Sequence, residues 1–389
     1  MTGKLDLGVG MVGYAFMGAV HSQAWRTVGH VFDLPVEVRM AAIGGRDPVA
    51  VKAAADRHGW SAAETDWRTL IARDDVQIVD ICTPGDTHAS IAIEALRAGK
   101  HVICEKPLAN TVSEASAMAE AAAEAATRGV RSMVAFNYRR VPALAYARSL
   151  VKAGRIGTLR HVRAAYQQDW LVDPSAPLTW RMQKERAGSG ALGDIAAHIV
   201  DAAQFVVGDV LSGVSGLTET FVRSRPLSGG SGLSAAVGGS GVGEVTVDDA
   251  AVFFGRFVGG GIATFEATRF ATGRKNAMQL EIYGSDGGIR FDFERMNELL
   301  FFDGSQPAEE AGYRRVLVTE PEHPYLGAWW PPGHPLGYEH TFTHEFRDFL
   351  VAVAEDADPS PSFADGLQVQ KVLAAVSLSA ESGSGWVVV

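Results

Sequence analysis

Short apolar runs alternate with helical segments through the first 136 residues, and this alternation constrains the fold more than any other feature. Buried strands are predicted at residues 7–12, 36–43, 76–82, 101–104 and 132–136. Helix signals separate them: Asp47-Pro48 is an N-cap followed by proline at the first helical position, and Gly99 is a C-terminal cap. Repeated strand–helix units predict a parallel, doubly wound sheet and an α/β fold.

The pattern changes after about residue 137. Segments that alternate apolar and polar residues, as in an antiparallel half-exposed sheet, lie at residues 159–168, 248–257, 261–268, 279–284 and 288–293. Helices are expected at residues 142–152, 194–207, 341–354 and 362–379. We therefore expect two domains, 1–136 with the parallel sheet and 137–389 as an α+β domain with a large open, mainly antiparallel sheet. The Gly/Ser-rich segment 228–243 is expected to be a mobile loop.

Composition narrows the class of protein. The chain has 389 residues and a formal net charge of −10, and this acidic balance disfavours nucleic-acid binding. Cys82 and Cys104 each end an apolar run, which indicates buried thiols in a reducing compartment. No stretch approaches the ~18 uninterrupted apolar residues of a membrane span, and no signal-peptide layout precedes the first strand. We expect a cytoplasmic protein without a nucleic-acid or membrane partner.

The first strand leads into a glycine-containing turn that opens the first helix. Such turns bind the pyrophosphate of a dinucleotide, because glycines let the backbone approach and the helix N-terminus supplies N–H donors and partial positive charge. Ala15 stands where the usual motif has its second glycine. A turn of this shape without a ligand is the alternative, but its place after the first strand favours a cofactor site. The predicted cofactor-binding residues are Gly13, Ala15, Phe16, Met17 and Gly18.

The choice of cofactor depends on the end of the second strand. An acidic residue there bonds the adenine ribose hydroxyls of NAD, whereas a basic residue suits the 2′-phosphate of NADP. Gly45 offers no carboxylate, and Arg46 can stack on adenine and grip a phosphate. Asp47 is the competing ribose ligand, although its place before Pro48 predicts a capping role. The sequence favours NADP over NAD.

Lys106 ends the apolar run at residues 102–105 and is followed by Pro107. Proline cannot continue a central strand and holds the preceding residue extended. Lys106 is therefore expected at a strand end, where open α/β sheets bind their ligands. A partly desolvated lysine there can titrate or polarise an oxygen. A solvated lysine at the start of a loop is the alternative.

Asp194 and His198 lie four residues apart near the start of the predicted helix 194–207, and so share one helix face. Histidine titrates near neutral pH and can exchange a proton with an alcohol, while Asp194 can orient a hydroxyl or tune the histidine. The alternative is an N-cap aspartate and an ordinary helix histidine. No third ligand has a convincing spacing, so no metal is expected.

These motifs together resemble the NAD(P)-dependent sugar and inositol dehydrogenases typified by glucose-fructose oxidoreductase and myo-inositol dehydrogenase, the Gfo/Idh/MocA family. The stretches that carry the resemblance, in family order, are residues 13–18, 83–88, 98–107 and 193–198. Residues 168–170, 180–181 and 362–366 look most like the levoglucosan dehydrogenase branch. The resemblance implies a Rossmann dinucleotide-binding domain followed by a substrate-binding and oligomerisation domain, whose open sheet joins a homodimer or homotetramer.

The resemblance also implies roles for single residues. Lys106 contacts the reacting oxygen, His198 is the acid/base group, and Asp194 lies beside it. Positions lining the nicotinamide end of the cofactor are Thr83, Pro84, His88, Glu105 and Lys106. The predicted substrate-binding residues are Lys106, Asn137, Tyr138, Trp170, Arg181, Asp194 and His198. A solvated loop is the alternative for Asn137 and Tyr138, and core or interface packing is the alternative for Trp170 and Arg181.

We therefore expect a dehydrogenase that oxidises a secondary alcohol of a sugar, anhydrosugar or inositol, with NADP or NAD as the hydride acceptor. Two alternatives stay open: a nucleotide-binding sensor without turnover, and a reductase of a non-sugar carbonyl. The presence of Lys106, Asp194 and His198 favours the enzyme over the sensor. The Asp–His pair favours a polyol over other carbonyl substrates.

Overall fold

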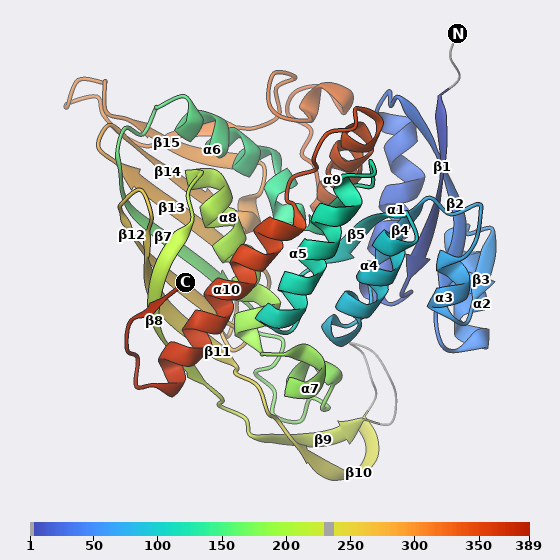
Figure 1. Cartoon of the computed structure of the whole chain (residues 1–389). Coiled ribbons are helices and arrows are strands. Elements are labelled where there is room, and N and C mark those ends of the chain that lie inside the picture. Colours follow the sequence, from blue (N-terminus) through green and yellow to red (C-terminus); the bar gives the residue numbers. More distant parts are fainter. Residues whose placement is uncertain (1–3, 229–236) are drawn as a thin grey trace. The chain divides into compact units, whose positions relative to one another are not determined.

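The computed structural model describes residues 4–228 and 237–389. Contacts within the chain define two compact units (Figure 1). The first comprises Met1–Asn137 and Gly337–Leu367, and the second comprises Tyr138–Leu336 and Gln368–Val389. The sequence-based division after residue 136 lies beside the first of these breaks. The sequence-based division placed residues 337–367 in the second domain, whereas in the structure they group with the first unit.

The first unit is built on a six-stranded parallel sheet, which confirms the expected doubly wound α/β arrangement. The strand order is β3-β2-β1-β4-β5-β6, and each neighbouring pair runs parallel. The strands are β1 (Leu5–Val12), β2 (Val36–Gly44), β3 (Ala62–Glu64), β4 (Ile78–Ile81), β5 (His101–Glu105) and β6 (Ser132–Ala135). The order reverses between β1 and β4, and doubly wound sheets bind ligands at the carboxyl ends of the strands at such a switch point.

The helices of this unit are α1 (Phe16–Val31), α2 (Pro48–His58), α3 (Trp67–Ile71), α4 (His88–Arg97), α5 (Val112–Ala126) and α9 (Tyr338–Ala354). Helix α9 completes the core although it comes from far along the chain. Its Phe346 ring stacks on Trp25 of α1 with centroids 4.0 Å apart, and Phe342 and Phe349 are buried in the same cluster. The short β3 and α3 were not predicted, because neither carries an apolar run long enough to stand out.

The second unit is built on a nine-stranded mixed sheet, in agreement with the predicted open, mainly antiparallel sheet. Its order is β16-β15-β14-β13-β7-β12-β11-β8-β17. Strand β12 pairs with β7 in parallel, whereas the other neighbours pair antiparallel. The strands are β7 (Leu159–Gln167), β8 (Leu211–Glu219), β11 (Ala250–Phe257), β12 (Ile262–Thr268), β13 (Ala277–Gly284), β14 (Gly287–Asp292), β15 (Glu298–Asp303), β16 (Arg314–Leu317) and β17 (Val387–Val388).

Helices cover one face of this sheet and leave the other face open (Figure 1). The covering helices are α6 (Pro142–Lys152), α8 (Ala197–Val207) and most of α10 (Phe363–Glu381), whose Ser379 hydroxyl accepts the Gly216 N–H of β8. Strand β11 shows the consequence: Phe253 and Phe257 are buried, while Val252 and Phe254, on either side of Phe253, are each 54% exposed. Successive side chains on a strand point to opposite faces, so the open face carries apolar side chains.

The Gly/Ser-rich segment 228–243 only partly follows its prediction as a mobile loop. Strand β9 (Ser224–Ser228) pairs antiparallel with β10 (Val237–Glu244), so residues 237–243 belong to a strand instead of a loop. Residues 229–236 lie outside the described residues. The ladder pairs Val237 and residues 242–244 with β9, across a register irregularity between them. This pairing could not be read from composition.

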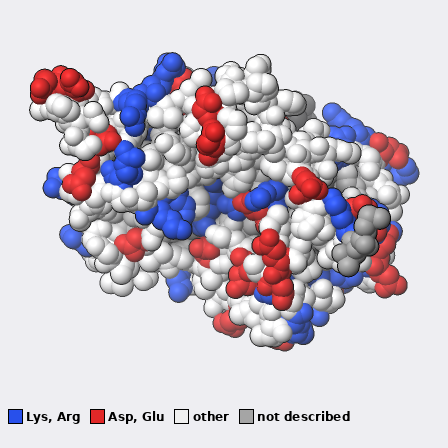
Figure 2. Space-filling view, turned by 90° about the horizontal axis from the view of Figure 1, so that it is seen from above, with Lys and Arg blue, Asp and Glu red and all other residues white. Residues whose placement is uncertain are grey.

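Among the described residues, one stretch, Lys184–Val207, is long and apolar enough to cross a membrane by length and composition alone. Most of that apolar window, 83%, is buried inside the structure, as in a core helix. Figure 2 shows acidic and basic side chains interspersed over one face of the molecule.

Candidate active site

The turn after β1 has the geometry that a pyrophosphate site requires. Gly13 has φ +106°, and a Cβ atom there would lie 2.7 Å from the Cys82 carbonyl oxygen. A Cβ atom on Gly18 would lie 2.2 Å from the Gly13 carbonyl oxygen. Both positions therefore need glycine. Ala15 has extended dihedrals of −75° and −156°, which any residue adopts, so the alanine fits this turn without strain.

The N-terminus of α1 also suits an anion. Ala15 provides no side-chain cap, and the first turn contains no acidic residue. The helix therefore keeps backbone N–H groups and partial positive charge at the turn. Phe16 is 52% exposed beside it, and Met17 is half-buried. The residues predicted from the sequence fit a dinucleotide phosphate at this point.

The end of β2 explains why no acidic residue stands there. A Cβ atom on Gly45 would lie 2.0 Å from the Tyr14 ring, so any larger side chain requires the ring to move. Arg46 is exposed. The Asp47 Oδ1 atom accepts the N–H groups of Val49 and Ala50 at 2.9 and 3.0 Å, which confirms its predicted capping role.

Lys106 follows the last residue of β5 and is half-buried. Glu105 beside it is 4% exposed, and its Oε2 atom accepts the Lys106 backbone N–H at 3.1 Å. This bond fixes the peptide from which the lysine side chain starts. The predicted place of Lys106 at the carboxyl end of a central parallel strand is confirmed.

His88 joins the two loops that carry the other nicotinamide-end candidates. It is 1% exposed, and its ring nitrogens lie 2.9 Å from the Thr83 carbonyl oxygen and 3.0 Å from the Pro107 carbonyl oxygen. The Thr87 hydroxyl donates to the Thr83 hydroxyl at 2.7 Å. His88 thus ties the ends of β4 and β5 together, and the 3-10 turn Gly85–Thr87 follows Pro84.

Sequence reasoning missed a buried polar cluster behind these loops. His21 of α1 contacts Asp80 of β4, Cys82 and Glu105, and the Trp25 indole N–H donates to Asp80 at 2.8 Å. An aspartate inside an apolar strand run was the signal that could have revealed the cluster. His21, Asp80 and Cys82 bring one ligand-type atom each within 4.8 Å. Mutual hydrogen bonds account for this closeness.

Asp194 lies in a π-helical segment, Leu192–Ala196 (η4), that leads into α8 with His198. The sequence predicted a regular α-helix from residue 194. Asp248 explains the difference, because its carboxylate accepts the Gly190 and Leu192 N–H groups at 2.6 and 2.8 Å and clamps the helix start. A Cβ atom on Gly190 would lie 1.7 Å from the Asp248 carbonyl oxygen, so only glycine fits there.

His198 is 8% exposed and packs against two neighbouring tyrosines. Its ring centroid lies 4.6 Å from that of Tyr138 and 5.9 Å from that of Tyr166. The two phenol oxygens lie 2.6 Å apart, and the Tyr166 hydroxyl donates to Asn276 at 2.7 Å. The structure therefore holds the ring plane of the predicted acid/base histidine within the second unit.

The remaining substrate candidates have different surroundings. Asn137 is 2% exposed, and its amide donates to the Thr341 hydroxyl at 2.9 Å within the first unit. Trp170 is half-buried and donates its indole N–H to Gln168 at 3.0 Å. The Arg181 guanidinium lies over the Trp180 ring, 4.4 Å from its centroid. Asn137 is thus an interior residue, whereas Trp170 and Arg181 present partly exposed surfaces.

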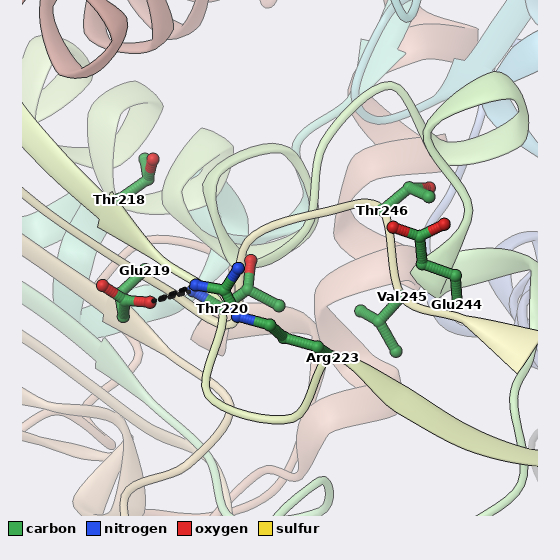
Figure 3. A pocket seen from close by; sticks show the side chains of 7 residues that line it. All are labelled: Thr218, Glu219, Thr220, Arg223, Glu244, Val245 and Thr246. Atoms are coloured by element: carbon green, nitrogen blue, oxygen red, sulfur yellow. Dashed lines mark hydrogen bonds and ion pairs between the residues drawn. The ribbon is translucent and has the colours of Figure 1, made fainter.

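A pocket of about 380 Å³ lies at the end of β8 beside β10 (Figure 3). It is lined by Thr218, Glu219, Thr220, Arg223, Glu244, Val245 and Thr246. Glu219 and Arg223 form an exposed ion pair of 3.8 Å. None of the predicted site residues lines this pocket, and it does not serve as the candidate active site.

A glycine turn at the switch point, a lysine at the next strand end, and an Asp–His helix in the second unit define a dinucleotide-dependent oxidoreductase. Residues 7–136 match the model of the oxidoreductase family with an NAD-binding Rossmann fold, and residues 144–290 match the GFO/IDH/MocA C-terminal domain. The chain belongs to the Gfo/Idh/MocA oxidoreductase family, which confirms the resemblance read from its motifs. The first unit is its NAD-binding domain.

Three similar proteins cover nearly the whole chain. Levoglucosan dehydrogenase of Pseudarthrobacter phenanthrenivorans is 43% identical over 390 residues, covering 98% of each chain. The crystal structure of an oxidoreductase domain protein from Kribbella flavida is 61% identical, with a TM-score of 0.94 and 99% of each chain covered. The structure of a levoglucosan dehydrogenase in complex with NADH and levoglucosan is 42% identical, with a TM-score of 0.92 and 99% of each chain covered.

Proposed function

We propose that this protein oxidises a secondary alcohol of a sugar, anhydrosugar or inositol with a nicotinamide cofactor, and that an anhydrosugar is its best substrate. The observation that carries the proposal is Lys106 at the carboxyl end of β5, in the Rossmann unit of a chain 43% identical to a levoglucosan dehydrogenase. That relative is similar along 98% of this chain, including the second unit, where most of the substrate candidates lie.

The nicotinamide, when bound, accepts the hydride from the carbinol carbon. Lys106 donates a hydrogen bond to the alcohol oxygen and stabilises the negative charge that develops on it. A ring nitrogen of His198 takes the hydroxyl proton, and the tilted rings of Tyr138 and Tyr166 pack against the imidazole and limit its rotation. Asp194 orients the hydroxyl.

Lys106→Ala and His198→Ala test these roles. Each should lower turnover of levoglucosan by about two orders of magnitude or more, because a charge-stabilising or proton-accepting group is lost at the reacting oxygen. Affinity for NADH, measured by fluorescence titration, should change little. Lys152→Ala and His30→Ala are the matched controls, since both side chains are exposed and distant in sequence from the candidate site. Near-normal turnover in either site variant would remove its assigned role.

NAD is the cofactor that the family match supports, and we propose that NADP is used at least as well. Arg46 is exposed just after β2. Gly45 has no side chain, and the Asp47 carboxylate is engaged in capping α2, so neither offers a carboxylate to the adenine ribose. A carboxylate there would favour the ribose hydroxyls of NAD and repel the 2′-phosphate of NADP.

Arg46→Ala should therefore weaken NADP binding about tenfold or more while NAD binding changes much less, because a charge-assisted phosphate contact is lost from NADP alone. Titration of wild type and variant with both reduced cofactors measures this. Arg39→Ala is the control, since Arg39 is exposed on the same strand and pairs with Asp6 instead. Equal losses for the two cofactors, or a clear wild-type preference for NAD, would contradict the NADP assignment.

We further propose that the open sheet face of the second unit joins subunits into a homodimer or homotetramer. Exposed apolar side chains cluster on it: Leu217, Val252, Phe254, Ile262 and Trp386, which are 49–63% exposed. A hollow of about 490 Å³ lies among Phe254, Ile262 and Trp386. Contiguous exposed apolar surface of this kind marks protein–protein contact.

Two buried free thiols, Cys82 and Cys104, suit a reducing compartment and support a cytoplasmic location.

A further inference from the structure

A histidine of the first unit lies sealed between two carboxylates that the proposed mechanism does not use. His21 of α1 and Asp80 of β4 are 0% exposed, and Glu105 at the end of β5 is 4% exposed. The His21 Nδ1 atom lies 3.0 Å from each Asp80 carboxylate oxygen. Its Nε2 atom lies 3.0 Å from Glu105 Oε1. The His21 ring therefore connects helix α1 with the neighbouring strands β4 and β5.

Geometry determines the charge of this ring. A neutral imidazole carries an N–H group on only one of its two nitrogens. The lone pair of the other nitrogen would then face a carboxylate and be repelled by it. An imidazolium donates to both carboxylates. Burial lowers the pKa of His21, but the charge of Asp80 and the hydrogen bonds to Asp80 and Cys82 outweigh burial and raise the pKa well above 6.5. Short contacts from both ring nitrogens to carboxylates agree with this direction.

The groups that face His21 come from each element packed against it. Asp80 and Cys82 face it from β4 and the residue after it, and Glu105 faces it from β5. Helix α9 contributes the rings of Phe342 and Phe346, with centroids 5.3 and 5.1 Å from that of His21. Burial raises the pKa of the Cys82 thiol, so the thiol stays neutral. The cluster thus holds two carboxylates and one cation.

Glu105 links this cluster to Lys106. One carboxylate oxygen is held by His21, and the other accepts the Lys106 backbone N–H at 3.1 Å. The carboxylate cannot rotate without losing one of these bonds. Its orientation therefore sets the peptide from which the Lys106 side chain extends.

We infer that His21 is a positioning residue for Lys106: its imidazolium joins Asp80 to Glu105 and thereby holds the Lys106 peptide in one orientation. This inference rests on the proposed role of Lys106. Without the cation, two like charges would be buried near one another, and one of them would take up a proton. The proton would be lost again as pH rises, so the orientation of Glu105 would become dependent on pH.

His21→Gln tests the inference because it removes the charge and leaves a donor for one carboxylate. We expect kcat/KM to fall about tenfold at pH 6 and about a hundredfold at pH 8.5, since small displacements of a catalytic group have effects of this size. The double variant His21→Gln/Glu105→Gln contains one carboxylate, so its loss should be equal at the two pH values. His30→Gln, at an exposed position of the same helix, should match wild type. A single-variant value within about twofold of wild type at pH 8.5 would overturn the inference, as would a loss that does not vary with pH.

Melting temperatures in the same buffers need no substrate. In folded His21→Gln the second buried carboxyl holds its proton to a higher pH than in the unfolded chain, and the stability from that proton is lost as pH rises. The Tm of His21→Gln should therefore fall with pH relative to the double variant, which has neither the histidine nor the second carboxylate. The double variant should not show this trend. If Tm shows the expected pH trend and kcat/KM does not, the role of His21 in positioning Lys106 is overturned, although its charge interaction with the two carboxylates is supported. Near-normal turnover of Lys106→Ala would instead refute the proposed function.

Glu105→Gln provides a second variant if His21→Gln does not fold. Glu105 accepts two N–H groups, from the His21 ring and from the Lys106 backbone, and the NH2 group of the new glutamine would face one of them. His21 and Asp80 remain paired. We expect kcat to fall about tenfold or more. A wild-type kcat in Glu105→Gln would overturn the inference.

Discussion

His101 makes the stability of the first unit depend on pH in the acid range. Its Nδ1 atom accepts the Arg131 N–H at 3.0 Å, which requires that nitrogen to be unprotonated. Burial, followed by the charge of Arg131, lowers the pKa of His101 to about 4 from 6.5. Between these values the unfolded chain binds more protons than the folded one. The stability from the neutral ring is therefore complete above pH 6.5 and is lost as pH falls towards 4.

His101→Asn keeps an acceptor near the Arg131 N–H and removes the titration. Wild type should lose more stability than the variant between pH 6.5 and pH 4, by at most about 3 kcal/mol. Thermal unfolding of both proteins across this range, followed by circular dichroism, measures the difference. Parallel curves would show that His101 does not contribute to acid sensitivity.

Single residues were predictable where their partners lie close in sequence. Asp47 caps α2 as expected, through the N–H groups of residues two and three positions further on. His21 was not predicted, because its partners Asp80 and Glu105 come from two later strands and only the folded sheet brings them together. The candidate residues of the site were found from the sequence, and the groups that hold them were not.

The segment that leads into α8 shows the same limit for a helix. Asp248 precedes β11 and clamps the Gly190 and Leu192 N–H groups, and the chain enters the π-helical turn at Leu192. The Arg269 side chain, 0% exposed, donates to the Asp248 carbonyl oxygen at 2.8 Å. A π-helical turn is uncommon and often marks a functional site. Local propensity predicts a helix here, but the long-range clamp decides its form.

Gly190→Ala should displace this helix start, because the added methyl group would lie 1.7 Å from the Asp248 carbonyl oxygen. We expect a loss of about 1–3 kcal/mol in stability and of about tenfold or more in kcat. NADH affinity should be retained, since the Rossmann domain is the first unit. Gly312→Ala is the control, because nothing lies within 4 Å of a Cβ atom there. A variant with wild-type kcat and Tm would show that the backbone can adapt at this position.

Helices with sequence caps were predicted well, and weakly patterned strands were not. Helix α2 (Pro48–His58) begins directly after Asp47, as the predicted N-cap and its proline indicated. Strand β3 has three residues, and β10 is rich in glycine, so neither carries the apolar alternation that identifies a strand. Their pairing with neighbouring strands supplies the order that their own residues lack.

The open face of the nine-stranded sheet governs how copies of the chain are proposed to assemble. Phe254→Glu introduces a charge in the middle of its apolar cluster and should shift the protein to a smaller species in solution, because a buried unpaired charge disfavours association. Leu378→Glu is a matched control: both side chains are 54% exposed, and Leu378 lies on α10 instead. Light scattering after size exclusion measures the mass of each variant. An unchanged mass for Phe254→Glu would contradict the proposed interface.

Helix α9 has a further consequence, for the order of events during synthesis. Strands β1 to β6 leave the ribosome long before Tyr338–Ala354 does, yet Phe342, Phe346 and Phe349 belong to the core around Trp25. Until then, the nascent Rossmann sheet exposes the apolar surface that α9 later covers. The amino-terminal unit cannot mature while the remainder is being translated. A cell that stops translation within the second unit is therefore left with an incomplete cofactor domain, which chaperones and proteases recognise by that exposed surface.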